Sequence, residues 1–593
     1  MWPLSPLQEG LLFHAALDDR GGPDVYTVQA VLALDGPVDA ARLRASWEAL
    51  VARHAALRAG FRHVSGAQMV QVIAREVTLP WREEDVSGLP PQEATAAADR
   101  VAGEELGRRF DLAAAPLLRI ALVKLPEDRH WMVVTSHHVL MDGWSMPVVM
   151  SELSALYAAG GDASGLPPTA SYRDYLAWLN RQDKHRARDV WRAELAGLDA
   201  PTLVAPADLT RLPDSGFVLT DLSEELTAGL VSLARGHGLT LNTVVQGAWA
   251  VVLSQLAGRT DVVFGATVSG RPAELPGVES MVGLLINTLP VRVPLDGRQP
   301  AVEMLTALQE RQAGLIAHQH LGLPEVQRLG GPGAVFDTLV VYENFPHAPG
   351  KPGSEGLSMR PAKLSRDTAH YPFTLVVAPG DRLHVKLDHQ LELFDRRTAE
   401  AVLGRLIRVL EQIASDPRVP VGRLASVGGP ELERVLREWN ATEAAVSGSS
   451  VPELFAERAA RTPDAVAVVD GKRNLTYAEL DADASRLAGH LIGRGVRRGD
   501  RVAVLMQRSA DLLTALLAIW RAGAAYVPVD VSNPAERITF LLKDSAPAAV
   551  LCSRSTRGAV PEDTPVPPLV LDDLTAEGRH RRRCRAPRTT SRT

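Results

Sequence analysis

The clearest pattern of apolar and polar positions lies in the second quarter of the chain. Residues 131–134 form an apolar run of strand length, which predicts a buried strand. After Ser145, apolar residues recur with a helical period until Gly160 and Gly161. The residues on this apolar face are Val149, Leu153, Leu156 and Tyr157. The pattern therefore predicts a strand, a short loop over residues 136–144 and a helix.

The same periodicity in the rest of the chain predicts an α/β protein with three regions. The first region, to about residue 427, alternates strand-like runs with helical patterns, as at 262–264, 339–342 and 398–413. Residues 428–451 are rich in glycine and serine and predict a linker that contains a short helix. Beyond it we predict a second α/β module, with buried strands at 465–469 and 502–505 and helices at 477–492 and 510–522.

The loop between the first predicted strand and helix contains His137, His138, Asp142 and Gly143. Imidazole is suited to proton transfer near neutral pH, so the histidine pair indicates acid/base chemistry. Adjacent side chains on an extended segment point to opposite sides, so only one histidine can face a substrate. We expect His138 to act and His137 to support it. Asp142 is expected to orient the loop, and Gly143 to adopt a backbone conformation that a Cβ disfavours.

Two other interpretations of this loop compete with catalysis. A single buried histidine is more often a structural core residue than a catalyst, but Asp142 and Gly143 at this spacing favour chemistry. A metal site is disfavoured because Asp142 is the nearest third ligand, whereas zinc sites recruit further ligands at regular spacing. We therefore expect no metal in this loop.

The composition excludes several classes of protein. The 593 residues include 64 basic and 70 acidic side chains, and this formal net charge of -6 argues against a nucleic-acid-binding chain. Only Cys552 and Cys584 are present, so neither a disulfide framework nor a cysteine metal cluster is expected. We predict no signal peptide and no membrane span, and we expect a cytoplasmic protein. Residues 576–593 are rich in arginine, and we favour a disordered tail over a binding arm.

Further motifs follow one another in order along residues 1–424. They are residues 3–14, Arg53-His54 with Leu57-Arg58 and Phe61, His137 to Gly143 (HHxxxDG), Tyr172 to Tyr175 with Trp178, Ser269 to Arg271, residues 275–279, Val282-Gly283, Asn287 to Pro290, and residues 318–320, 336–338 and 342–344. In this order the motifs resemble the condensation domain of nonribosomal peptide synthetases. Ala59 is a small departure, because the family usually has threonine there.

The resemblance implies a fold and a reaction. The fold is a pair of chloramphenicol-acetyltransferase-like lobes, residues 1–175 and 176–427, whose shared cleft forms a tunnel. The reaction is amide formation, in which the amine of a downstream aminoacyl thioester attacks an upstream peptidyl thioester. Both substrates would arrive on phosphopantetheine arms of partner carrier proteins. The chain itself would bind no covalent cofactor, and its partners would be other synthetase modules rather than nucleic acid or membrane.

The resemblance also implies roles for individual residues. His138 is the expected active-site histidine, His137 supports the loop and Asp142 is structural. Arg58 is expected to pair with Asp142 across the fold, and a backbone N–H near Gly143 is a candidate oxyanion donor. Whether His138 removes the amine proton or orients the amine stays open at this stage. Three further motif residues are expected at the tunnel, namely Trp144, Ser145 and Asn287.

Two finer expectations follow from the same resemblance. The sequences at 3–10 and 142–145 look like the subgroup of condensation domains that accepts a D-configured donor. Residues 452–575 resemble the start of an adenylation domain of the AMP-forming family, with motifs at 475–480 and 521–530. The phosphate loop rich in glycine, serine and threonine does not follow, so we expect this fragment to be truncated and inactive in ATP-dependent activation.

Three alternative functions share the fold or part of the motif set. A catalytically silent recruitment domain is disfavoured by the intact histidine motif, and an epimerase by the adenylation motifs downstream. An acyltransferase that uses free coenzyme A is disfavoured by the motifs after Gly270. Residues 329–333 resemble a carrier-protein Leu-Gly-Gly site, but no serine follows, so we expect a loop there. Whether Met1 is the natural start is left open.

Overall fold

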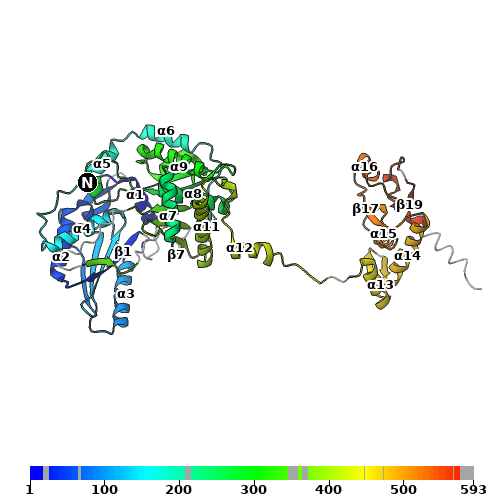
Figure 1. Cartoon of the computed structure of the whole chain (residues 1–593), viewed down its shortest axis with the longest axis horizontal. Helices are drawn as coiled ribbons and strands as arrows, with labels where there is room; N and C mark the ends of the chain where they lie inside the picture. Colours follow the sequence, from blue (N-terminus) through cyan, green and yellow to red (C-terminus); the bar gives the residue numbers. More distant parts are fainter. Residues whose placement is uncertain are drawn as a thin grey trace, which may run out of the picture. The chain divides into compact units, whose positions relative to one another are not determined.

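The computed structural model forms two compact units, Met1–Asn440 and Ala441–Thr593, and each is described separately (Figure 1). It describes every residue except 18–23, 25, 65–67, 207–214, 345–357, 364–370, 446–447, 472, 565 and 575–593. The arginine-rich tail predicted at 576–593 therefore lies outside the described residues.

The first sheet of the larger unit has five strands in the order β11-β1-β6-β5-β4. Their bounds are β1 Thr27–Asp35, β4 Trp81–Asp85, β5 Leu118–Lys124, β6 His130–His137 and β11 Ser358–Pro361. Helices α2 (Ala40–Arg53) and α4 (Ser145–Ala158) bury their apolar faces against one side of the sheet, and α3 (Pro91–Gly107) covers the other side. Both sides of the sheet are apolar, which explains the nearly continuous burial of β5 and β6.

The second sheet has six strands in the order β7-β13-β12-β10-β8-β9. Their bounds are β7 Ser215–Asp221, β8 Asp261–Val268, β9 Asn287–Pro294, β10 Thr338–Tyr342, β12 Phe373–Ala378 and β13 His384–Gln390. One large apolar core joins it to α7 (Glu224–Gly236), α8 (Leu241–Ala257), α9 (Ala301–Leu315) and α11 (Arg396–Ser415). The strands predicted at 262–264 and 339–342 and the helix predicted at 398–413 are confirmed.

One strand departs from the predicted division of the chain at residue 175. Strand β11 lies in the later part of the chain, yet it pairs with β1 of the first sheet in antiparallel register, from Leu32 opposite Pro361 to Asp35 opposite Ser358. Arg360 adds an exposed ion pair to Asp35, with Nε 2.8 Å from Oδ2. The two sheets therefore do not correspond to two uninterrupted segments of sequence.

Further described elements of the larger unit include four helices and a hairpin. They are α1 Pro6–Leu17, α5 Tyr172–Asn180, α6 Lys184–Glu194 and α10 Leu323–Gly330, with the hairpin β2 Ala59–Val64 and β3 Gln68–Ile73. The loop predicted at 329–333 is wrong in part, because its first two residues end α10 and the rest forms a 3-10 turn, Gly331–Ala334. The predicted linker begins with a short helix, α12 Gly429–Glu433, followed by a π-helical turn, Arg434–Glu438.

The smaller unit contains a four-stranded parallel sheet in the order β17-β16-β18-β19. Its elements are β16 Arg501–Leu505, β17 Ala525–Pro528, β18 Ala549–Cys552, β19 Pro568–Val570, α13 Val451–Arg461, α14 Tyr477–Gly493, α15 Ala510–Arg521 and α16 Ala535–Ser545. The buried strand at 502–505 and both predicted helices are confirmed. The buried strand predicted at 465–469 is wrong in its burial. Among the described residues, strand β14 (Val466–Asp470) pairs only with β15 (Arg473–Thr476), and Val469 is 69% exposed.

Within the described part of the chain, no single helix is long and apolar enough to cross a membrane. Helices α7 and α8 are long and apolar enough only when taken together, and they are bent by 107° relative to each other.

Candidate active site

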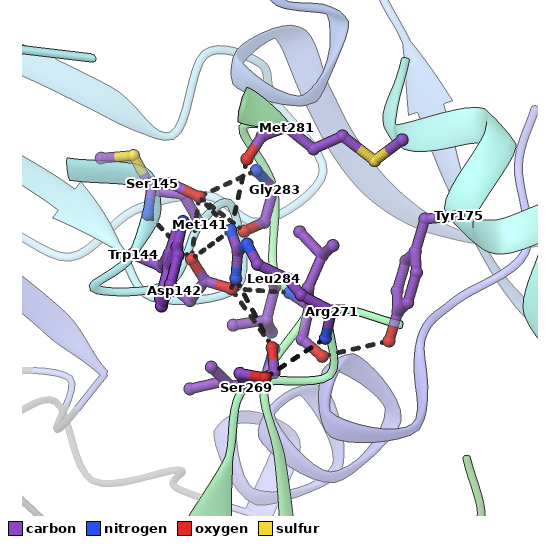
Figure 2. Close-up of polar contacts among 12 residues, drawn as sticks. Met141, Asp142, Trp144, Ser145, Tyr175, Ser269, Arg271, Met281, Gly283 and Leu284 are labelled. Atoms are coloured by element: carbon purple, nitrogen blue, oxygen red, sulfur yellow. Dashed lines mark hydrogen bonds and ion pairs between the residues drawn. The ribbon is translucent and has the colours of Figure 1, made fainter. Parts of the chain in front are cut away.

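The predicted strand, loop and helix around the two histidines are confirmed. His137 is the last residue of β6, and Ser145 is the first residue of α4. The connection between them is only seven residues long, so the side chains of the histidines and of Asp142 stay close in space. The loop lies against residues 269–286, a segment that precedes β9 of the second sheet (Figure 2).

His137 is fully buried, and both of its ring nitrogens are engaged. The N–H of Val139 donates to Nδ1 at 3.1 Å, and Nε2 lies 3.1 Å from Oδ2 of Asp24. A nitrogen that accepts a hydrogen bond cannot hold a proton, so the ring proton belongs on Nε2. His137 therefore has no free nitrogen for a substrate, and it supports the loop.

His138 is only half-buried, and its ring is oriented by the loop itself. Its Nδ1 lies 3.2 Å from the carbonyl oxygen of Met141, and its main-chain N–H donates to the carbonyl of Tyr26 at 2.8 Å. A carbonyl only accepts hydrogen bonds, so Nδ1 holds the proton and Nε2 keeps its lone pair. Nε2 forms no hydrogen bond with any described residue, so it is the nitrogen that can meet an incoming donor.

Asp142 is completely buried and receives donors on both oxygens (Figure 2). Oδ1 accepts the N–H of Ser145 at 2.9 Å, its hydroxyl at 2.8 Å and Nη2 of Arg271 at 3.1 Å. Oδ2 accepts Nη1 of Arg271 at 2.9 Å and the N–H groups of Leu285 and Ile286 at 2.9 and 3.3 Å. A carboxylate saturated in this way acts as a structural anchor, not as an acid or base.

The expected pairing of Arg58 with Asp142 is wrong. The partner is Arg271, whose side chain is 3% exposed and forms a bidentate pair with the carboxylate. Arg58 instead donates to the carbonyls of Val51, Ala74 and Arg75. It therefore closes the turn after α2 and does not reach the histidine loop.

Trp144 and Ser145 also join the loop to residues 269–286. The indole N–H of Trp144 donates to the carbonyl of Glu279 at 3.0 Å, and the guanidinium of Arg271 lies 5.3 Å from the centre of the indole ring. The buried hydroxyl of Ser145 accepts the N–H of Gly283 at 3.1 Å. Both side chains are therefore engaged in contacts within the protein, and these contacts hold the loop against the facing segment.

Gly143 is exposed, but the expected backbone conformation that a Cβ disfavours is not found there. Glycines with positive φ in the described chain include Gly270 and Gly277, and Gly143 is not among them. Its carbonyl accepts the N–H of Met146 at 3.3 Å, and its own N–H donates to no described residue. Gly270, in the segment that faces this loop, has a φ of +59°, a conformation that a Cβ disfavours.

Asn287 is buried, and its side-chain amide is already satisfied. Nδ2 donates to the carbonyls of Gln319 and Leu321 at 2.9 and 2.7 Å, and Oδ1 accepts the N–H of Thr288 at 2.9 Å. Asn287 thus fixes the turn before α10 to the start of β9. Both N–H groups of the amide are used, so only the second lone pair of Oδ1 remains for a substrate.

The segment that receives Asp142 is held tightly from its other side. A Cβ on Gly270 would lie 1.8 Å from the carbonyl oxygen of Leu285, so only glycine fits. Tyr172 and Tyr175 donate their hydroxyls to the carbonyls of Leu284 and Leu285 at 2.8 and 3.0 Å. Sequence reasoning identified these residues only as motif members, and the spacing gave no sign that Arg271 was the ion-pair partner.

Asp24 and Gln8 are two further site residues that sequence reasoning did not single out. The side-chain amide of Gln8 donates to the carbonyl of Val139 at 3.0 Å, and its Oε1 accepts the N–H of Ser5 at 2.9 Å. The motif at residues 3–14 thus fixes the histidine loop to α1. The only sequence signal for Gln8 was its place in the motif at residues 3–14. No sequence signal pointed to Asp24.

Comparison with known proteins identifies the family to which the chain belongs. Residues 1–434 match the Condensation domain family, and residues 455–586 match the AMP-binding enzyme family. The chain belongs to the condensation-domain family. It has the condensation domain followed by AMP-binding domain that is found in nonribosomal peptide synthetases.

Curated relatives are synthetases of several peptides. A linear gramicidin synthase of Brevibacillus parabrevis is 37% identical over 571 residues, which cover 94% of this chain and 11% of that protein. Chondramide synthase of Chondromyces crocatus is 32% identical over 635 residues, which cover 95% of this chain and 16% of that protein. The chain thus spans between about a tenth and a sixth of the length of these two relatives.

Solved structures agree with the fold of both domains. A nonribosomal peptide synthetase with AMPPNP bound has a TM-score of 0.75 and 26% identity, and the match covers 96% of this chain and 60% of that chain. The first condensation domain of the calcium-dependent antibiotic synthetase, in complex with a substrate analogue, has a TM-score of 0.60 at 22% identity. That match covers 72% of this chain and 99% of that chain.

We expect Arg271→Met to destabilise the condensation domain by about 3 to 5 kcal/mol, because it leaves the carboxylate of Asp142 buried without its counter-charge. Arg360→Met is the matched control, since it removes an exposed pair to Asp35 and costs at most about 1 kcal/mol. Denaturant-dependent hydrogen exchange on peptides from the larger unit measures both changes. Equal effects of the two substitutions would contradict the role given to Arg271.

Proposed function

We propose that the condensation domain forms an amide bond between two thioester substrates. The observation that supports this most directly is Nε2 of His138, which is unpartnered in the described chain beside a saturated, buried Asp142. The donor is an upstream peptidyl or aminoacyl thioester, and the acceptor is the amine of a downstream aminoacyl thioester. Both are delivered on phosphopantetheine arms of carrier proteins that belong to neighbouring synthetase modules.

The chemistry required of the protein is modest, because a thioester is already electrophilic. The amine nitrogen attacks the thioester carbonyl, the new C–N bond forms, and the C–S bond breaks as the donor thiolate leaves. His138 Nε2 accepts a hydrogen bond from the amine, which aims the nitrogen lone pair at the carbonyl, and it takes up the proton that the amine loses. That proton then neutralises the departing thiolate.

The developing oxyanion needs a donor close to the same loop. The N–H of Gly143 lies on an exposed residue, points to no described acceptor and is the candidate that we propose. Asp142, in this proposal, contributes only by holding the turn between His138 and α4 in place, because all of its hydrogen-bonding capacity is used.

We propose that the two lobes predicted around residue 175 form the tunnel for the two carrier arms. The support for this is that the histidine loop extends from the first sheet, whereas the residues packed on it lead into β9 of the second sheet. A substrate at His138 would therefore lie where the two sheets meet.

The low cysteine content of the chain supports a cytoplasmic location for the reaction.

We expect His138→Ala to lower the rate of amide formation by about 10² to 10⁴-fold, because the residue that orients the amine and accepts its proton is lost. The assay presents loaded donor and acceptor carrier proteins and follows the condensed product by mass spectrometry. His384→Ala is the matched control, because His384 is exposed on β13 and pairs only with Asp221 in the described chain.

The same assay separates the other functions of this fold. If neither the wild-type chain nor His138→Ala forms the amide, the result supports a recruitment domain without catalysis. Exchange of the donor α-proton for deuterium without amide formation would support an epimerase. Wild-type rates in His138→Ala would overturn the catalytic assignment.

We further propose that the donor has the D configuration at its reacting residue. The support is the form of the motifs at residues 3–10 and 142–145. Gln8 of the first motif donates to the carbonyl of Val139, three residues before the second motif. Parallel reactions with D- and L-configured donors are therefore expected to give product only with the D form, measured by chiral chromatography of the amide. Equal use of both donors would defeat this proposal.

The AMP-binding residues within this sequence are proposed to be inactive in amino-acid activation. Between residues 452 and 575 there is no loop rich in glycine, serine and threonine with a lysine to hold ATP phosphates. We expect no ATP–pyrophosphate exchange above background with any amino acid. A radiolabelled pyrophosphate assay on the 593-residue chain measures it, and exchange with any single amino acid would contradict the proposal.

A further inference from the structure

A largely buried carboxylate, that of Asp24, lies beside His137. Asp24 lies just before β1, and its Oδ2 is 3.1 Å from Nε2 of His137. The side chain of His137 is wholly buried, and that of Asp24 is 10% exposed. Nothing in the proposed reaction uses this pair directly, because neither side chain reaches His138 Nε2.

The surroundings of Asp24 keep it ionised and fixed. Burial by itself raises the pKa of Asp24. The hydrogen bond and electrostatic attraction of His137, the N–H of Tyr26 and the charge of Arg109 outweigh burial and hold the pKa below its usual value. The N–H of Tyr26 donates to Oδ1 at 2.9 Å, and the N–H of Thr27 donates to the Asp24 carbonyl at 3.0 Å. Asp24 is thus an anionic acceptor at a set position.

An anionic acceptor at Nε2 decides which nitrogen of His137 holds the proton. With the proton on Nε2, Nδ1 is free to accept the N–H of Val139, as the structure shows. If the proton moved to Nδ1, two N–H groups would face each other across 3.1 Å, and the turn after His138 would lose this bond. The charge on Asp24 therefore controls a main-chain contact that lies next to the active histidine.

The same short segment also holds His138 by its main chain. The carbonyl of Tyr26, two residues after Asp24, accepts the N–H of His138 at 2.8 Å. His138 is therefore flanked by two contacts that depend on Asp24 and its neighbours, one at its own N–H and one at the N–H of Val139. Its ring orientation, set by the carbonyl of Met141, depends on this turn.

We infer that Asp24 is a positioning residue for condensation, because it fixes the Nε2–H tautomer of His137 and through it the main-chain turn that aims His138. This inference rests on the proposed function of His138. Asp24 touches no reacting atom in this scheme, and it acts only through His137.

Asp24→Asn tests the inference, since the change removes the charge while keeping the size of the side chain. The N–H of Tyr26 holds the amide oxygen of the asparagine in the place of Oδ1, so the amide NH2 faces Nε2 and donates to it. This favours the Nδ1–H tautomer of His137 and disrupts the contact with Val139. We expect kcat for amide formation to fall about 10- to 100-fold with little change in KM, because carrier-protein binding is untouched while the reacting geometry shifts. Asp221→Asn is the matched control, as it alters an exposed Asp–His pair with 2.6 Å between Oδ1 and Nδ1 of His384.

Nitrogen NMR of the full chain with ¹⁵N-labelled histidine reads the tautomer independently of activity. The His137 signals are assigned by their absence in His137→Gln. In the wild-type chain we expect the pattern of a neutral ring with the proton on Nε2, and a different pattern in Asp24→Asn. An imidazolium or an Nδ1–H ring in the wild type would overturn the inference, even if Asp24→Asn does not fold.

A double-mutant cycle tests whether Asp24 acts through His137 alone. In the His137→Gln background, Asp24→Asn is expected to have no further effect on kcat, and additive losses would overturn the inference. Unchanged kcat in Asp24→Asn alone would also overturn it. Absence of amide from the wild-type chain would instead refute the proposed function. The NMR spectra would still determine which ring nitrogen of His137 holds the proton.

Discussion

The ion pair between Asp142 and Arg271 is the interaction on which the rest of this site depends. A carboxylate removed from water must receive all its hydrogen bonds from protein groups, and here both oxygens are filled by Arg271, Ser145 and the main chain of 285–286. The two charged residues are 129 positions apart in the chain. The histidine loop therefore gains its final geometry only when residues 269–286 have packed on it.

Such a pair determines geometry more than it adds stability. Removing two charges from water costs several kcal/mol each, and their attraction offsets this only when the remaining donors are satisfied. Gly270 and Gly283 make that satisfaction possible, since a Cβ on either would lie within 2.4 Å of Leu285 or Tyr172. These glycines allow the main chain to approach the carboxylate closely. The rigid result suits the proposed reaction, which depends on placing two tethered substrates.

The two adjacent histidines differ because their surroundings differ. His137 is enclosed, with Asp24 and Val139 on its two nitrogens, whereas His138 is half-buried and has one nitrogen committed to Met141. In the proposed reaction, His137 supports the loop and His138 performs the chemistry. His137 ends β6, whereas His138 begins the turn that follows, so the two side chains meet different surroundings.

The sequence by itself determined the local elements and the residue types of the site. Periodicity predicted β6, α4 and the helices α14 and α15, and the HHxxxDG spacing indicated His138, because these signals depend on neighbours within a few residues. Only the tertiary structure decided that Arg271, and not Arg58, meets Asp142, that Asp24 supports His137, that β11 joins the first sheet and that β14 is exposed. Each of these outcomes depends on contacts between segments distant in sequence. The local sequence around a guanidinium, a carboxylate or an apolar strand is the same whichever distant partner it contacts, so it does not identify that partner.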